Sequence, residues 1–325
     1  MTSNEIVASS EAVGPAETAI AAGAGAGGAG ARGRSPGRWA RAVVREARPR
    51  QWPKNLLVFA APLAGATMGR PGGALYAVVA AVAFLCASAS VYFVNDVMDV
   101  ERDRRHPVKC NRPIASGSLP VGDAIVIAVI LAAVAIGAGF AIGVPALSAV
   151  TGGYLASSTF YSTRGKHLPY VEMALVASGF VLRVLAGAVA TRVPPSPWFL
   201  AVCSLGALSV AVGKRYAEIT SLGPDAVRHR PVTRFYQAGR VRVVQVTIAA
   251  AMVATYVMWA LWEPVAGARD WHLASAVPLA LALARFAMLT GRRSVRPVED
   301  MITRDGLMIA CEAAWLALFI VGLFT

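Results

Sequence analysis

Charged residues are scarce in this chain of 325 residues, and acidic residues are scarcer than basic ones. Only 15% of the residues are charged; 18 are Asp or Glu and 31 are Lys or Arg. Because 56% of the residues are hydrophobic, so little charge cannot cover the surface of a soluble domain. The composition therefore excludes a soluble globular protein and predicts a helical protein that crosses a membrane several times.

Cysteine is also rare, and its spacing excludes two further classes of protein. The four cysteines, Cys86, Cys110, Cys203 and Cys311, form no CxxC pair. Neither a disulfide framework nor a zinc site is therefore indicated. A secretory signal is lacking too, because residues 1–35 are rich in Ala and Gly and have no basic start followed by an apolar core. We expect this segment to be a disordered tail.

Nine apolar segments follow, each near the length that a helix needs to cross a bilayer. The residues before them, 36–53, mix arginines with Trp39, Val43 and Val44, which is typical of an amphipathic helix on an anionic membrane surface. We therefore predict an all-α fold, a polytopic membrane bundle of nine transmembrane helices over residues 54–325. The predicted spans are 54–70, 73–95, 121–142, 145–162, 168–190, 196–213, 243–262, 271–290 and 306–324.

The net charge of +13 is unevenly divided between two sets of loops. Of the 31 Lys and Arg residues, 26 lie in the N-terminal arm or after the second, fourth, sixth and eighth spans, whereas the opposite side has only Arg70, Arg192 and Arg269. By the positive-inside rule, the basic loops and the N-terminus face the cytoplasm of a cell whose inner membrane holds the chain. Phosphate or anionic lipid explains such loops better than nucleic acid does.

An acidic cluster comes directly after the second span. Asn95, Asp96, Asp99 and Asp103 form the pattern Asn-Asp-x-x-Asp-x-x-x-Asp, whose aspartates fall on one face of a helix. Like charges repel at this range unless a cation lies between them. Mg²⁺ takes carboxylate oxygens and completes its shell with substrate phosphates. We predict Asn95, Asp96 and Asp99 as metal ligands and the three aspartates as catalytic residues; the alternative is a solvated charged loop.

Basic and aromatic residues in the same cytoplasmic loops suit phosphate groups, although orientation and anchoring of the spans alone would also explain them. Glu172 begins a span, where it could cap the helix, bind a second ion or accept a sugar hydroxyl. Arg183 lies midway along a span, so we predict that it lines the site, with a buried ion pair as the alternative. The predicted substrate-binding residues are Lys54, Asn95, Lys109, Arg112, Tyr161, Lys166, Glu172, Arg183, Lys214, Arg215 and Tyr216.

The nine spans, the aspartate motif after the second and the basic-aromatic loops after the fourth and sixth resemble the UbiA superfamily of intramembrane prenyltransferases over about residues 45–325. Typical aromatic prenyltransferases of this superfamily carry a second aspartate-rich motif after the sixth span, where this chain has Lys214 and Arg215. The strings that are similar to the branch acting on decaprenyl phosphate and phosphoribosyl diphosphate are residues 48–55, 111–114, 166–167 and 213–218.

The resemblance implies a Mg²⁺-dependent phosphoribosyltransferase. It would move 5-phosphoribose from phosphoribosyl diphosphate to a polyprenyl (decaprenyl) phosphate lipid in the membrane, on the route to the arabinose donor of cell-wall arabinan. One alternative is a UbiA-type prenyltransferase that moves a prenyl group from prenyl diphosphate to an aromatic acceptor. A transporter is disfavoured, because the ionisable residues gather at one face and no clear repeat is seen. The sequence leaves open whether the protein forms a homo-oligomer.

Overall fold

The structure is a computed structural model that describes residues 35–65, 67–262, 266–292 and 298–324. Every regular element in these ranges is helical, so the predicted all-α fold is confirmed for this part of the chain. The predicted tail lies outside the described residues, except for its last residue, Ser35.

Seven helices of the described chain are long and apolar enough to cross a membrane. They are α3 (Gly73–Met98), α5 (Val121–Ala141), α7 (Val171–Ala190), α8 (Pro197–Leu222), α10 (Ala238–Leu261), α11 (Ala266–Gly291) and α13 (Gly306–Phe324). The other helices are α1 (Pro36–Glu46), η1 (Pro49–Phe59), α2 (Ala60–Ala64), η2 (Thr67–Gly69), α4 (Val100–Arg104), η3 (Lys109–Asn111), α6 (Pro145–Thr163), η4 (Gly165–His167), η5 (Gly223–Asp225), α9 (Ala226–His229), η6 (Pro231–Phe235) and α12 (Val298–Arg304).

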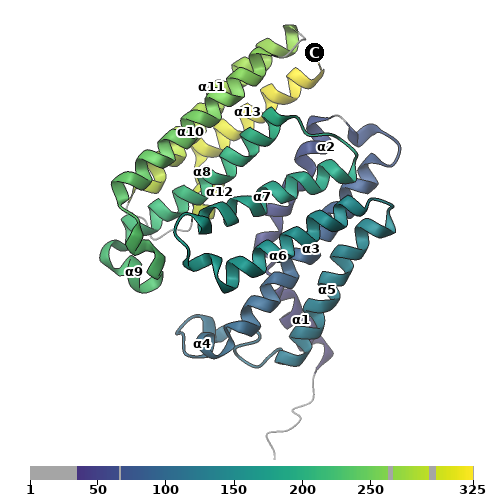
Figure 1. Cartoon of the computed structure of the whole chain (residues 1–325), viewed down its shortest axis with the longest axis vertical. Coiled ribbons are helices and arrows are strands. Elements are labelled where there is room, and N and C mark those ends of the chain that lie inside the picture. Colours follow the sequence, from purple (N-terminus) through teal and green to yellow (C-terminus); the bar gives the residue numbers. More distant parts are fainter. Residues whose placement is uncertain (1–34, 66, 263–265, 293–297, 325) are drawn as a thin grey trace, which may run out of the picture.

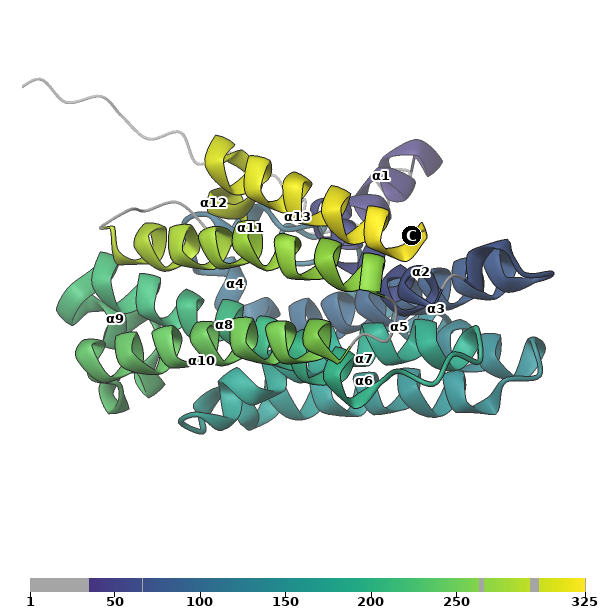
Figure 2. The same ribbon diagram turned by 90° about the horizontal axis from the view of Figure 1, so that it is seen from above.

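The long helices pack in chain order. The pairs α3–α5, α5–α6, α6–α7, α7–α8, α8–α10, α10–α11 and α11–α13 all lie in contact. In Figure 1, α10, α11 and α13 lie on one side of the molecule and α3, α5 and α6 on the other, with α7 and α8 between them. Figure 2 shows the short helices α4, α9 and α12 toward one end, so the connections that carry the predicted site residues share that end of the bundle.

The predicted count of nine spans is not confirmed. The segment 145–162 forms the helix α6, but its many Gly, Ser and Thr residues leave it without a stretch as long and as apolar as those in the seven candidate spans. The segment 54–70 forms no single helix, and its described residues divide among η1, α2 and η2. Pro53 and Pro62 have no N–H for a continuous α-helical ladder, which explains this division.

The connection from α1 to α2 is an unusually long 3₁₀ helix. η1 contains 11 residues, whereas 3₁₀ helices rarely exceed about four. Arg48, directly before it, has a left-handed backbone with φ of 52°. Tertiary contacts must therefore hold η1, and α7 supplies one: a Cβ at Gly187 would overlap the carbonyl oxygen of Val58.

The helix predicted before the first span is present as α1, which ends at Glu46 rather than near residue 53. Ala42 packs in a cluster with Phe93 of α3 and Ala124 of α5, and Trp39 borders that cluster. The indole of Trp39 also donates a hydrogen bond of 2.9 Å to Asp123 Oδ2. These contacts fix α1 against the bundle, and its place on a membrane surface stays a prediction.

Candidate active site

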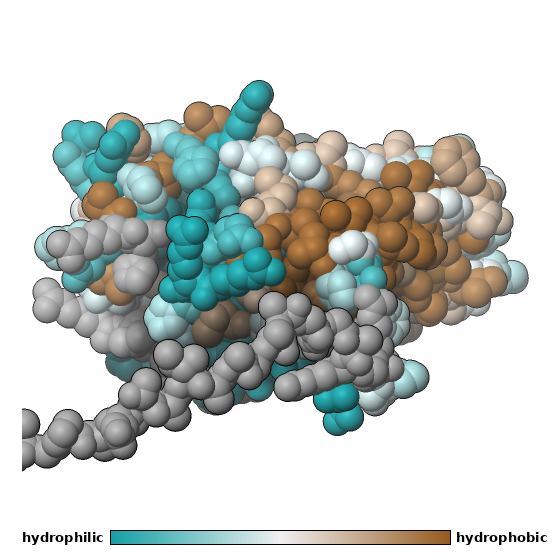
Figure 3. All heavy atoms as spheres, turned by 90° about the horizontal axis from the view of Figure 1, so that it is seen from below, coloured by the Kyte–Doolittle hydropathy of each residue, from teal (hydrophilic) through white to brown (hydrophobic). Residues whose placement is uncertain are grey.

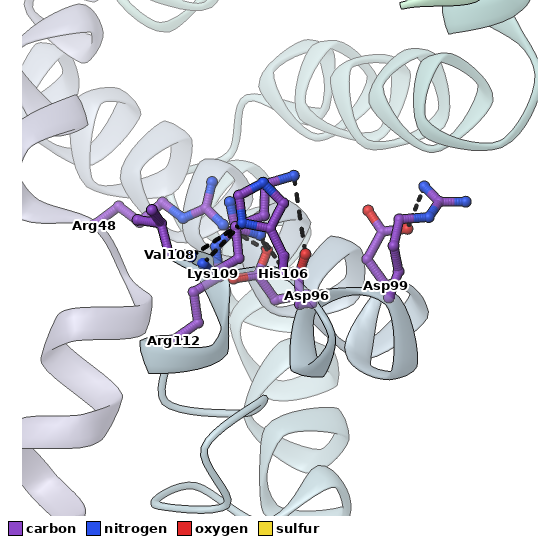
Figure 4. A network of polar contacts seen from close by, with 9 residues as sticks. Arg48, Asp96, Asp99, His106, Val108, Lys109 and Arg112 are labelled. Atoms are coloured by element: carbon purple, nitrogen blue, oxygen red, sulfur yellow. Dashed lines mark hydrogen bonds and ion pairs between the residues drawn. The ribbon is translucent and has the colours of Figure 1, made fainter. Parts of the chain in front are cut away.

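Asp96, near the end of α3, is the centre of a cluster of opposite charges. Its side chain is 4% exposed, and its Oδ1 atom accepts hydrogen bonds from Arg48 Nη2 at 2.5 Å and Arg112 Nη1 at 3.0 Å. Figure 4 shows both arginines directed at Asp96. The Arg48 guanidinium also lies over the ring of Tyr92, 4.9 Å from its centroid. Such charge-assisted hydrogen bonds compensate the burial of a carboxylate.

The same arginine joins Asp96 to Asp103. Arg112 Nη1 lies 2.6 Å from Asp103 Oδ2, and Lys109 Nζ lies 3.9 Å from Asp103 Oδ1. Asp103 is 1% exposed, and its Oδ1 atom has no hydrogen-bond partner among the described residues. Four predicted site residues, Asp96, Asp103, Lys109 and Arg112, are therefore brought together.

Asp99 lies apart from this group. Helix α3 ends at Met98, and Asp99 has φ of −96° and ψ of 5° before α4 begins. Because the helix is interrupted there, spacing in the sequence no longer places Asp99 beside Asp96. Its side chain is 34% exposed and contacts Arg102 Nη1 at 3.4 Å (Figure 4). Within the described ranges, no three acidic, His or Cys side chains converge as a metal cluster.

A further acidic residue, Glu46, is buried next to Asp96. It is 1% exposed, and neither carboxyl oxygen has a hydrogen-bond partner in the described part of the chain. Burial first, and then the neighbouring Asp96, raises the pKa of Glu46 to about 8, against the opposite effect of Arg48 and Arg112. Glu46 is therefore mostly protonated near pH 7 and adds little negative charge to the cluster.

A second charged cluster surrounds Glu172 at the start of α7. Glu172 is fully buried; its Oε1 atom lies 3.1 Å from Arg215 Nε and its Oε2 atom 2.6 Å from Arg230 Nη1. Arg215 also pairs with Glu218, whose Oε1 atom lies 3.7 Å from Arg230 Nε. Two arginines and two glutamates thus neutralise one another and join α7, α8 and the connection between α9 and η6.

Two tyrosines complete the Glu172 cluster. Arg230 Nη1 donates to the Tyr161 hydroxyl at 3.3 Å, and the Tyr236 hydroxyl donates to Glu172 Oε1 at 3.2 Å. Burial raises the pKa of Tyr236 to about 12, so its hydroxyl stays protonated and able to donate. That hydroxyl also accepts from the backbone N–H of Tyr170, whose φ is 63°. These contacts fix the chain where it enters α7.

Arg183, halfway along α7, has neutral partners and is 5% exposed. Its Nε donates to Asn55 Oδ1 at 2.9 Å and its Nη1 to the Gly179 carbonyl at 2.6 Å. Its Nη2 lies 3.0 Å from Ser88 Oγ and 3.3 Å from the Tyr154 hydroxyl. The buried ion pair considered as an alternative is not found among the described residues.

The remaining predicted residues lie on separate elements around these clusters. Lys54 is in η1, Lys166 in η4, and Lys214 in α8 with Tyr216. The ring of Tyr216 lies under the guanidinium of Arg242, 5.4 Å from its Cζ atom. The sixth span was predicted to end at residue 213, but α8 continues to Leu222, so Lys214 and Tyr216 lie within a helix and not in a loop. Phosphate binding stays a prediction for each of these residues.

An apolar groove of ≈ 380 Å³ opens beside Asn95. Residues of α3, α5 and α6 line it, and its polar members are Ser90, Asn95 and Thr159. Asn95 directly precedes Asp96, and Thr159 comes two residues before Tyr161, so the polar part of the groove adjoins both charged clusters in sequence. Figure 3 shows hydrophilic residues gathered over one part of a face of the molecule and hydrophobic residues over much of the rest.

Residues 56–301 match the UbiA prenyltransferase family. The chain belongs to this family. It is 36% identical over 294 residues to the decaprenyl-phosphate phosphoribosyltransferase of Corynebacterium glutamicum, and this match covers 89% of each chain. It is 37% identical over 290 residues to the enzyme of that name from Mycobacterium tuberculosis, and this match covers 87% of this chain and 94% of that enzyme. The resemblance drawn from the aspartate motif and the basic loops is confirmed.

Solved UbiA structures share the fold. A UbiA homologue from Archaeoglobus fulgidus, bound to GPP and Mg²⁺, aligns with a TM-score of 0.63 at 16% identity over 87% of this chain and 98% of that chain. A digeranylgeranylglyceryl phosphate synthase aligns with a TM-score of 0.66 at 14% identity over the same shares. The arrangement of helices is thus that of the UbiA family, in a multi-pass membrane protein.

The UbiA fold implies a divalent cation, and the residues at the aspartate motif suit one. Asp99 is partly exposed, and its described contact with Arg102 is long at 3.4 Å. Asp103 Oδ1 lacks a hydrogen-bond partner among the described residues, and Asn95 adds an amide oxygen. Carboxylate and amide oxygens, completed by phosphate, are ligands of hard divalent cations. The aspartates do not converge on one point in the described part of the chain, so cation binding by this motif stays a prediction.

The sequence did not predict several members of the two charged clusters, one around Asp96 and one around Glu172. Arg48 and Glu218 lie inside strings that indicate the family, so their position was a usable signal. Arg230 and Tyr236 lie in the long connection after α8, where no spacing marks them, and only the fold brings them to Glu172. Glu46 reads as one more charge of an amphipathic helix until its burial is seen.

Proposed function

We propose that this UbiA-family enzyme transfers 5-phosphoribose from phosphoribosyl diphosphate to a polyprenyl phosphate and releases diphosphate. The observation that carries the proposal is the 36% and 37% identity to two decaprenyl-phosphate phosphoribosyltransferases over most of their length. The polyprenyl phosphate is then decaprenyl phosphate or a close homologue. The product would supply the lipid-linked arabinose donor of cell-wall arabinan.

The distribution of cations supports this choice of donor. Phosphoribosyl diphosphate carries a 5-phosphate in addition to its diphosphate, and the acceptor brings a third phosphate group, so more cations are needed than for a prenyl diphosphate. Arginine forks and lysine charges bind such groups. We propose that the phosphates contact members of a set of basic and hydroxyl side chains: Lys54, Lys109, Arg112, Tyr161, Lys166, Lys214, Arg215 and Tyr216.

The aspartate cluster would hold the leaving group. Mg²⁺ held by Asn95, Asp96 and Asp99, with Asp103 beside them, would offset the charge that develops on the departing diphosphate. Arg48 and Arg112 neutralise Asp96 in the structure. If the aspartates held a cation, Arg48 and Arg112 would be free to bind phosphate oxygens.

The reaction then exchanges one bond at ribose C1 for another. The C1–O bond to the diphosphate breaks, and a phosphate oxygen of the acceptor forms the new C1–O bond from the opposite side, which inverts the anomeric centre. Because the acceptor phosphate is already an anion, no strong general base is required. Glu172 would orient Arg215 and Arg230 toward the donor, since its two carboxylate oxygens pair with both arginines.

The membrane arrangement completes the proposal. The isoprenoid chain of the acceptor would lie in the groove beside Asn95, whose lining is mostly apolar. We propose that α6 and the η1–α2 segment complete nine crossings, with the basic connections and the site at the cytoplasmic face of the inner membrane. Soluble phosphoribosyl diphosphate is then supplied from the same side.

A lipid-phase labelling assay tests the proposal. The purified protein in phospholipid nanodiscs is incubated with ribose-labelled phosphoribosyl diphosphate, decaprenyl phosphate and Mg²⁺, and the organic phase is counted. We expect label in the lipid phase and one diphosphate released per label transferred. Omission of decaprenyl phosphate should abolish both signals.

The alternative is transfer of a prenyl group to an aromatic acceptor, which the GPP-bound UbiA homologue makes worth testing. A parallel incubation uses labelled geranyl diphosphate and a hydroxybenzoate. Prenylation of the aromatic compound without ribose transfer to lipid would refute the phosphoribosyltransferase proposal and favour this alternative.

A further inference from the structure

Arg183 joins elements that are far apart in the sequence. Its guanidinium donates to Asn55 of η1 over 2.9 Å and to Ser88 of α3 over 3.0 Å, and Ser88 Oγ donates to Asn55 Oδ1 over 3.3 Å. None of the three residues is more than 6% exposed. A charge at such a depth is costly unless hydrogen bonds compensate it, so this network holds the Asn55 amide in one orientation.

The donors of Arg183 are directed at the protein itself. A guanidinium has five N–H groups, and its acceptors here are Asn55, Ser88, Tyr154 and the Gly179 carbonyl. Ser88 precedes Asp96 by eight residues of the same helix, about 12 Å at 1.5 Å per residue. Arg183 therefore does not contact the aspartate cluster through α3, and any effect that it has there passes through η1, which it holds at Asn55.

That segment is η1, whose conformation depends on such contacts. Two sites fix its C-terminal half on α7: Asn55 at Arg183, and Val58 at the side-chain-free surface of Gly187. Its N-terminal end carries Arg48, which binds Asp96 Oδ1 at 2.5 Å. An 11-residue 3₁₀ helix has little stability of its own, so the position of Arg48 depends on where η1 is held.

We propose that Arg183 is a positioning residue that fastens η1 to α7 and thereby presents Arg48 to the aspartate cluster. The fork geometry of the guanidinium is the essential property, because one side chain must reach η1, α3 and the carbonyl of Gly179 together. Lysine, a single point of positive charge, cannot do so. The consequence for donor use rests on the proposed function, whereas the fastening of η1 does not.

Four substitutions separate fastening from the alternatives. Asn55→Leu removes the acceptor at similar size, Asn55→Asp keeps an acceptor at the same place, and Arg183→Lys keeps the charge without the fork. Tyr154→Phe is the matched control, because it removes a partner of Arg183 that does not belong to η1. Hydrogen–deuterium exchange of residues 49–59 reports the fastening, and kcat/KM for phosphoribosyl diphosphate reports its consequence. Size-exclusion chromatography selects the folded fraction for both measurements.

We expect Asn55→Leu and Arg183→Lys to speed exchange across residues 49–59 and to lower kcat/KM for the donor about tenfold, since small displacements of positioned groups have effects of this order or larger. Asn55→Asp and Tyr154→Phe should keep both values near those of the unaltered enzyme. A slow-exchanging segment in Asn55→Leu would overturn the proposal. So would Asn55→Asp if it lost donor use with unchanged exchange, because the net charge of Arg183 would then matter instead. If the unaltered enzyme transfers no phosphoribose, the exchange results alone decide the proposal.

Discussion

Glu172 Oε1 lies 3.1 Å from Arg215 Nε, and the two side chains are 1% and 6% exposed. Arg230 binds the other carboxylate oxygen of Glu172 at 2.6 Å. Replacing one partner of a buried pair leaves an uncompensated charge, which typically costs about 3–5 kcal/mol. We therefore expect Glu172→Gln to lower the free energy of unfolding by about 3 kcal/mol, measured as a lower midpoint of thermal unfolding in detergent.

Glu218→Gln is the control for this experiment, because Glu218 pairs with the same two arginines but is 22% exposed. Its effect should be clearly smaller, since solvent screens an exposed charge. An equal shift for the two variants would contradict the central place given to Glu172.

The aspartates of the motif should differ in what their loss does to folding. Asp96→Asn and Asp99→Asn should each lower transfer about a hundredfold or more, as loss of charge stabilisation at a leaving group does. Asp96→Asn should also lower stability, because Arg48 and Arg112 lose their buried partner. Asp99→Asn should leave stability nearly unchanged, since Asp99 is 34% exposed. Turnover and thermal unfolding are measured on the same preparations.

Glu101→Gln controls for the acidity of this region, because Glu101 is 69% exposed and pairs with Arg104. It should transfer at the unaltered rate. Near-normal turnover by Asp96→Asn or Asp99→Asn would remove the cation role from the motif.

Glu46 should make the stability of the protein depend on pH. An unfolded glutamate with the ordinary pKa of 4.5 loses its proton above that pH, whereas folded Glu46 keeps it until about pH 8. Between these values the folded state holds the extra proton, so the free energy of unfolding falls as pH rises, by at most about 1.4 kcal/mol per pH unit. Glu46→Gln should remove this slope. Between pH 6 and 8, the free energy of unfolding of the variant should therefore rise relative to that of the unaltered protein. If the free energy of unfolding of the two proteins changed in parallel with pH over this range, Glu46 would not be a buried member of the Asp96 cluster.

Filling the groove beside Asn95 should weaken use of the lipid acceptor. Ala132 lines the groove, so we expect Ala132→Trp to raise KM for decaprenyl phosphate about tenfold, or about 1.4 kcal/mol, with KM for phosphoribosyl diphosphate unchanged. Ala133→Trp is the control, since its neighbour Ala133 is exposed and does not line the groove. Equal KM values for the two tryptophan variants would place the isoprenoid chain elsewhere.

Much of this molecule could be predicted from apolar runs and loop charges. The segment 145–162 corresponds closely to α6, and the aspartate motif and basic loops led to the right family. The apolar run at 54–70 does not form one helix, because hydropathy does not register that prolines divide the backbone into short helices, and its crossing of the membrane stays a prediction. Length and composition alone therefore leave the number of crossings open.

The site was predicted less completely, for two physical reasons. The spacing of Asp96, Asp99 and Asp103 predicts one helical face, but the helix breaks at Asp99 and turns it away. Partly buried partners such as Arg230 come from a connection far along the sequence, and no local sequence pattern marks them. The charged residues in the sequence indicated where both clusters lie. Which side chains pair within each cluster could be seen only in the folded structure.

Arg48 and Arg112 give Asp96 its own counter-ions within the protein. The buried carboxylate of Asp96 is thus held and balanced by cations of the protein itself. Under the proposed function, a divalent cation would then be needed for transfer but not for the folded state. Chelators such as EDTA would then silence the enzyme reversibly without unfolding it.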